Sequence, residues 1–117
     1  VADDYKKANH NPIAVINGDR SKQIIQIKAK RGDTITLSSA DSSDPDGNAT
    51  TSHWMIYPEA GTYVGDVKLS REAGTETMLN LLKSDHADGG TLHIILTVED
   101  DGKPSLVAYR RAIIFIE

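Results

Sequence analysis

The 117-residue sequence contains no cysteine, which excludes disulfides and thiolate metal ligands. Aromatic residues are scarce, at 5% of the chain, with one tryptophan, four tyrosines and one phenylalanine. No apolar run approaches the roughly 20 residues that a membrane-spanning helix requires. The sequence also lacks a Gly-x-Ser-x-Gly nucleophile elbow and a phosphate-binding glycine-rich loop. We therefore expect neither a membrane partner nor an enzymatic activity of this chain by itself.

Positive charge is also in short supply, since 13 basic residues stand against 17 acidic ones and the formal net charge is -4. No basic patch stands out beyond Lys28–Arg31 and Arg110–Arg111. Nucleic-acid-binding domains instead carry a basic patch or stripe. We therefore expect no nucleic-acid partner.

What the chain has is a series of short apolar segments separated by turn signals. The segments expected to be strands are 13–16, 23–27, 34–38, 52–57, 63–69 (one or two edge strands), 75–82, 91–99 and 106–116. The turns include Asn17-Gly18 and the loop from Asp41 to Asn48, in which Pro45 and Gly47 suit the second and fourth positions of a turn. This pattern predicts an all-β fold, an antiparallel two-sheet β-sandwich of seven to nine strands, immunoglobulin-like and of the PKD type.

Period-two alternation predicts which side chains form the core of the sandwich. The inner positions expected from this alternation are Ile35, Leu37, Thr77, Leu79, Leu81, Leu92, Ile94, Leu96, Val98, Ala112, Ile114 and Ile116. Trp54, the single tryptophan, stands where such a sandwich places its central core residue, and Phe115 is expected on the outer face. Pro12 marks the domain boundary, so residues 1–11 are expected to be a linker or the tail of an upstream domain and residues 12–117 the sandwich.

The loop after residue 40 offers oxygen ligands at alternate positions, in Asp44, Asp46 and Asn48. This spacing resembles the start of a calcium loop, but the residue twelve along from Asp44 is Met55 and not a bidentate glutamate. The alternative is a plain turn whose aspartates accept backbone N–H groups, and this interpretation is favoured. The four histidines have no helical i,i+4 pair for zinc. We expect no metal site and no cofactor, with calcium as the open alternative.

A candidate ligand-binding platform lies around the loop after residue 57. Tyr57 and Tyr63 flank it and could stack on sugar rings, and Glu59 could contact a sugar hydroxyl. The alternative is that both tyrosines pack over sheet edges. Glycoside hydrolysis needs two placed carboxylates and the loop supplies one, so no catalytic residue is expected.

Several motifs together resemble one known family. They are Asp41-Ser-Ser-Asp-Pro-Asp-Gly47, Tyr57-Pro-Glu-Ala-Gly-Thr-Tyr63 and Leu92-His-Ile-Ile-Leu-Thr-Val-Glu-Asp-Asp-Gly102. They resemble the C-terminal domain of secreted bacterial proteins described as cellulose-binding, whose N-terminal domain is similar to a nucleoside hydrolase. The resemblance implies a noncatalytic accessory module of an exported protein, secreted or periplasmic. It also implies an upstream nucleoside-hydrolase-like domain as a partner within the same chain.

Two hypotheses for function follow from the residues and the resemblance together. In the first, the module helps a carbohydrate-processing protein to bind polysaccharide. In the second, it is a structural domain that packs against and stabilises the neighbouring hydrolase-like domain. An exposed apolar patch around Met55, Ile95 and Phe115 would favour the second hypothesis.

Overall fold

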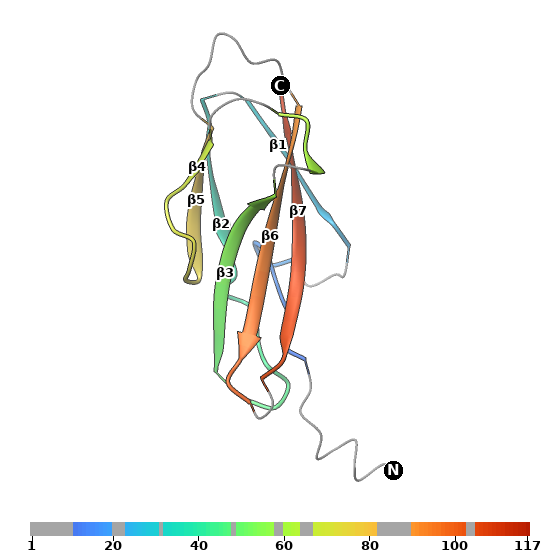
Figure 1. The fold of residues 1–117 in the computed structure, drawn as a ribbon, viewed down its shortest axis with the longest axis vertical. Helices are drawn as coiled ribbons and strands as arrows, with labels where there is room; N and C mark the ends of the chain where they lie inside the picture. The colour runs from blue at the N-terminus through green and yellow to red at the C-terminus, as the bar shows by residue number, and fades with distance from the viewer. Residues whose placement is uncertain are drawn as a thin grey trace.

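The fold is a sandwich of two β-sheets (Figure 1), and the computed structural model describes residues 11–19, 23–30, 32–47, 49–57, 60–63, 67–81, 90–102 and 105–117. The strands within these residues are β1 (Ile25–Ala29), β2 (Thr34–Ser38), β3 (Thr50–Tyr57), β4 (Val67–Leu69), β5 (Glu76–Leu81), β6 (Gly90–Asp100) and β7 (Val107–Ile116). In the described part of the chain, no helix is long and apolar enough to cross a membrane. The predicted all-β sandwich is confirmed.

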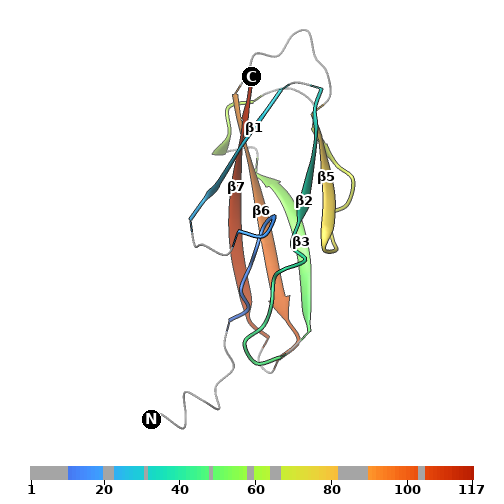
Figure 2. The ribbon, with the colours of Figure 1, turned by 180° about the vertical axis from the view of Figure 1, so that it is seen from behind.

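The strands form a four-stranded sheet in the order β1-β7-β6-β3 and a three-stranded sheet in the order β2-β5-β4. The two views in Figures 1 and 2 show these sheets lying face to face. The longest pairing joins β6 to β7, an antiparallel hairpin running from Gly90↔Ile116 to Glu99↔Val107. This hairpin gives the four-stranded sheet its centre, and β3 and β1 add to its two sides.

One pairing differs from the predicted wholly antiparallel arrangement. β1 runs parallel to β7, from Ile25↔Ala112 to Ala29↔Ile116. Two parallel strands need a long crossover connection, and here the whole sandwich between β1 and β7 supplies it. The local pattern of β1 indicates a strand but carries no information on its partner, so the prediction was wrong for this pair. The immunoglobulin-like type of the sandwich stays a prediction.

Alternation along the strands places the predicted residues in the core. The buried apolar side chains of the two central strands are Leu92, Ile94, Leu96, Val98, Ala112, Ile114 and Ile116. Leu37, Leu79 and Leu81 are buried on the facing sheet, and Ile35 packs partly buried against them. Trp54 is 2% exposed, and its indole Nε1 donates to the carbonyl oxygen of Gly74 at 3.0 Å. The sandwich therefore encloses its single tryptophan as the sequence predicts.

The segment before β1 differs from the predicted hairpin of 13–16 with 23–27. Residues 13–16 form only isolated bridges, although Val15 and Ile16 are fully buried. The Asn17-Gly18 turn does form, with φ of 51° and 79° at its two residues, the left-handed pair of a type I′ turn. The segments on either side of this turn do not pair as a hairpin. Val15 N instead donates to Ser42 Oγ at 2.8 Å.

Arg110 holds this segment against β7. It occupies an inward position of the strand and is buried. Its guanidinium donates to the carbonyl oxygens of Gln23 (3.0 Å), Ala14 (3.3 Å) and Asp19 (2.8 Å), and pairs with the Asp19 carboxylate. These bonds tie Ala14, Asp19 and Gln23 to β7, where no regular hairpin ladder forms among the described residues.

Candidate functional site

Tyr63 does not form the expected platform with Tyr57, because its side chain is 8% exposed and belongs to the core. The backbone explains its position. Thr62 N and Tyr63 N both donate to the carbonyl oxygen of Thr91 at 2.9 Å, which brings this segment against the start of β6. Gly61 allows the approach, since a Cβ there would collide with the Thr91 oxygen. Glu59, the third residue of the predicted platform, lies outside the described residues.

Tyr57 lies instead on the outer face of the four-stranded sheet, the face that points away from β2, β5 and β4. It is 39% exposed, and its partner across the β3–β6 pairing is His93. The next residue in that row is Ile113 on β7. In the described part of the chain, His93 Nδ1 is buried without a hydrogen-bond partner. Tyr57 thus presents its ring from one side of a broad, pleated surface.

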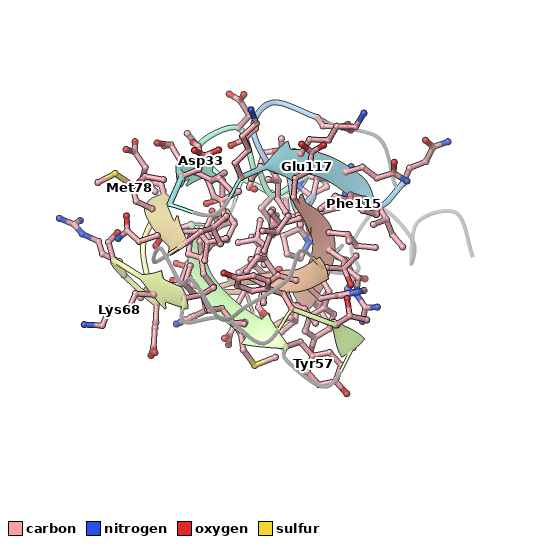
Figure 3. All side chains as sticks on the ribbon, turned by 90° about the horizontal axis from the view of Figure 1, so that it is seen from above. Asp33, Tyr57, Lys68, Met78, Phe115 and Glu117 are labelled. Carbon is pink, nitrogen blue, oxygen red and sulfur yellow. The ribbon has the colours of Figure 1, made fainter. Side chains whose placement is uncertain are left out.

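Two more rings share this outer face. Tyr109 and Phe115 both stand on β7, at outward positions that alternate with the buried Arg110, Ala112 and Ile114. Among the residues that the structure describes, Tyr109 is the most exposed large apolar side chain, at 70%. Phe115 is 38% exposed, as the sequence predicts for the outer face. Figure 3 shows Tyr57 and Phe115 pointing away from the core, with Met78 and Lys68 at the opposite side of the sandwich.

Aliphatic side chains lie among these rings. Met55 is 51% exposed and pairs across the strands with Ile95, which pairs in turn with Arg111. Ile113 lies in the adjacent row, beside His93. The apolar patch named from the sequence, around Met55, Ile95 and Phe115, is therefore present on one face. Exposed patches of this kind are typical of interaction surfaces.

The acidic loop adopts the turn that the sequence favours over calcium binding. Asp44 Oδ1 accepts a hydrogen bond from Asp46 N at 2.7 Å, and Gly47 N donates to the Asp44 carbonyl oxygen at 3.0 Å. Asn48 lies outside the described residues, as do His10 and His86. Among the residues that the structure describes, no group of three His, Asp or Glu side chains could hold a metal ion. Calcium at Asp44, Asp46 and Asn48 stays an untested alternative.

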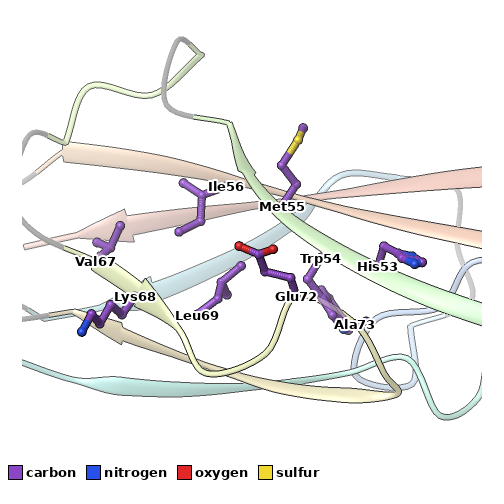
Figure 4. Close-up of a pocket in the computed structure, with 9 residues that line it drawn as sticks. All are labelled: His53, Trp54, Met55, Ile56, Val67, Lys68, Leu69, Glu72 and Ala73. Atoms are coloured by element: carbon purple, nitrogen blue, oxygen red, sulfur yellow. The ribbon is translucent and has the colours of Figure 1, made fainter.

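A groove that the sequence did not indicate lies between the edge strands of the two sheets. It has a volume of about 750 Å³ and is lined by residues 53–56 of β3, residues 67–69 of β4, Glu72 and Ala73. Figure 4 shows the Glu72 carboxylate between the two strands and Lys68 pointing away. Only strand pairing could have located this groove, because β3 and β4 belong to different sheets.

The loop between β4 and β5 closes part of this side. Trp54 N donates to the Glu72 carbonyl oxygen at 2.7 Å, and Gly74 N donates to the Ser52 carbonyl oxygen at 2.9 Å. The loop therefore pairs with the outer edge of β3 like a short additional strand. Among the groove's lining residues Glu72 is the single carboxylate, whereas glycoside hydrolysis uses two. Trp54 also lines the groove, but it is buried, so its indole face is not available to a sugar.

Comparison with known proteins decides the family. The family model described as "Cellulose-binding protein Sde0182, C-terminal domain" matches residues 34–116, well over half of the chain. The chain belongs to this family. The match to the Sde0182 C-terminal domain family thus confirms the resemblance seen in the Asp41–Gly47, Tyr57–Tyr63 and Leu92–Gly102 motifs, all three of which lie within the matched residues.

A solved structure is also similar to this member of the Sde0182 C-terminal domain family. It is that of a nucleoside hydrolase-related protein from Saccharophagus degradans, associated with carbohydrate metabolism. The two are 36% identical, with a TM-score of 0.88 over 97% of this chain. The match covers 27% of that protein, so most of the relative lies outside the shared domain. No curated protein matches the chain.

Proposed function

We propose that this domain is a noncatalytic accessory module of a longer, exported carbohydrate-processing or nucleoside-hydrolase-like protein. We further propose that it binds polysaccharide through the outer face of the four-stranded sheet. The family description and the carbohydrate-associated relative support the first part. Export accords with a ligand such as cellulose, which lies outside the cell. Catalysis by the domain itself is not part of the proposal, because the groove has one carboxylate among its lining residues.

The observation that carries the proposal is the position of the three exposed rings. Tyr57, Tyr109 and Phe115 lie on one face, on strands that share a sheet. Tyr109 and Phe115 are six residues apart on β7, so about 20 Å separates them along the strand. A pleated, open face with several rings suits an extended polymer better than a small molecule, which proteins usually bind in a concave pocket.

Native affinity electrophoresis in gels containing soluble polysaccharides, together with depletion by insoluble cellulose, tests this proposal. The domain should be retarded or depleted by at least one polymer. Tyr57→Ala, Tyr109→Ala and Phe115→Ala should each weaken that binding. Met78→Ala is the matched control, because Met78 is 44% exposed but lies on the three-stranded sheet. If none of the three ring variants weakens the binding, the outer face is not the contact surface.

A second candidate function is docking against a neighbouring hydrolase-like domain. The specific observation in its favour is the aliphatic part of the same face, in which Met55 and Ile95 are cross-strand partners. If a second domain covers this face, β3 and β7 should exchange amide hydrogens more slowly in the full-length protein than in the isolated domain. Met55→Glu should then separate the domains without unfolding the sandwich. Equal exchange in both forms would argue against docking.

A further inference from the structure

A hollow of about 360 Å³ opens beside Tyr109, which is 70% exposed. Its lining includes Tyr109 and Arg111 on β7, Ile95 on β6 and Ile24 just before β1. Ile24 is 51% exposed, so the hollow has an apolar wall on the side of Tyr109 that faces the edge of the sheet. An aromatic ring, an aliphatic wall and a guanidinium therefore meet at one point of the outer face.

The two consecutive arginines of β7 have different surroundings. Arg110 points inward, and its guanidinium is bonded to Gln23, Ala14 and Asp19. Arg111 points outward, and the described residues give its side chain neither a hydrogen bond nor an ion pair. A guanidinium carries five N–H donors in a planar fork that fits a carboxylate. The guanidinium of Arg111 is thus available to donate hydrogen bonds to a ligand.

The charge of the outer face is opposite to that of the chain as a whole. The formal net charge of the chain is -4. Within the strands, however, the outward positions of the four-stranded sheet carry Lys28 and Arg111 against one carboxylate, Glu99. Glu99 lies near the end of β6, where it accepts a hydrogen bond from Ser105 Oγ at 2.8 Å. Glu117 follows beyond the end of β7. Acidic residues are therefore kept away from the centre of this face.

We propose that the outer face binds a polysaccharide whose sugars carry carboxylates, a uronate-containing glycan. Arg111 pairs with a uronate carboxylate, and Tyr109 packs against the face of a sugar ring. A neutral polymer would leave the fork of Arg111 without its complementary charge, whereas a carboxylate engages two of its donors at once. This inference rests on the proposed function and names the ligand class for the same surface.

The test compares a carboxylated polymer with its methyl ester, which lacks only the free carboxylate, and with an unrelated neutral polymer. Affinity electrophoresis is run in polygalacturonate, in the same polymer after methyl esterification, and in neutral hydroxyethylcellulose. Polygalacturonate should retard the domain most strongly. Because hydrogen bonds to charged groups contribute about 1.5–3 kcal/mol, Arg111→Gln should weaken this binding roughly tenfold or more. Arg111→Lys, which keeps the charge but loses the fork, should lie between wild type and Arg111→Gln.

Arg71→Gln is the control for nonspecific attraction, since Arg71 is exposed in the loop between β4 and β5. Added salt should weaken wild-type binding to polygalacturonate more than it weakens Arg111→Gln. The ester comparison needs no variant, so it decides the question even if Arg111→Gln fails to fold.

Each remaining outcome separates this inference from the proposed function. Binding to the neutral polymers that requires Tyr109 but ignores Arg111→Gln would overturn the uronate assignment and leave the module's glycan-binding role standing. An equal loss in Arg71→Gln and Arg111→Gln would overturn the assignment as general charge attraction. Binding to no polymer at all would overturn both.

Discussion

Arg110 and Asp19 form an ion pair in which Nη2 of the arginine lies 3.0 Å from Oδ1 of the aspartate, although 91 positions separate them in the chain. The arginine side chain is 5% exposed, while that of Asp19 is 46% exposed. The arginine is therefore the buried member of the pair. We expect it to stabilise the fold less through the ion pair than through its hydrogen bonds to three carbonyl groups.

Arg110→Ala should lower the free energy of unfolding by roughly 3 kcal/mol, because it leaves buried carbonyl groups unsatisfied. Asp19→Asn should cost less than about 1 kcal/mol, since the carboxylate is partly solvated and exposed pairs contribute little. Urea unfolding followed by circular dichroism measures both. Arg71→Ala is the control with an exposed arginine. Equal effects of the Arg110 and Arg71 variants would contradict the proposed role of Arg110 in fixing the N-terminal segment.

Trp54→Phe should destabilise the sandwich by roughly 2 kcal/mol. The substitution removes the indole N–H that reaches Gly74 O and leaves part of the Trp54 volume empty. Circular dichroism is the suitable probe, because the variant has no tryptophan fluorescence. Met55→Ala, at the neighbouring but outward position, should stay within about 0.5 kcal/mol of wild type. A large loss for Met55 and none for Trp54 would contradict the assigned inner face of β3.

Gly61→Ala should cost roughly 2–3 kcal/mol, because the new methyl group would meet the backbone oxygen of Thr91, which has no flexible end to move aside. Gly47 provides a contrast, since it has φ of +77° but open space around the position of a Cβ. Gly47→Ala should cost only about 1 kcal/mol of backbone strain. Chemical denaturation of the two variants side by side distinguishes collision from strain, and a smaller loss at Gly61 than at Gly47 would refute the close approach.

Ser39 and Ser52 share a buried hydrogen bond of 2.6 Å between their hydroxyl oxygens, joining the segment after β2 to β3. Either serine-to-alanine substitution should lower the free energy of unfolding by about 1–2 kcal/mol, because the remaining buried hydroxyl loses this hydrogen-bond partner. The double variant should lose less than the sum of the two, with a coupling free energy of about 1 kcal/mol in a double-mutant cycle. Strict additivity would mean that the hydrogen bond contributes nothing to stability.

The parts of the fold that could be predicted from the sequence are those that depend on the local alternation of apolar and polar residues along a strand. The row Leu92, Ile94, Leu96 and Val98 has period two without interruption, and it is the buried face of β6. Trp54 shares its face with Ile56 in the same way, and both packed as expected. The family resemblance followed from contiguous motifs, which can be recognised in the sequence without knowledge of the fold.

What could not be predicted depends on contacts between distant segments. The parallel partner of β1 and the hydrogen-bond partners of Arg110 both depend on residues 11–19 and 23–24 lying against β7. Tyr63 looked like a surface residue because no regular strand surrounds it, and its burial depends on the close approach of Gly61 to Thr91. For the candidate site, the sequence predicted Tyr57 and Tyr63 as a platform and Phe115 on the outer face. Strand register was needed to show that Tyr57 shares this face with Tyr109 and Phe115.

The pairing of Glu72 and Gly74 with the outer edge of β3 has a consequence for behaviour at high concentration. An uncovered strand edge is a template on which other polypeptides can assemble into amyloid-like stacks. By folding its own loop over that edge, the domain blocks this route to aggregation while leaving the broad face of the sheet open to solvent.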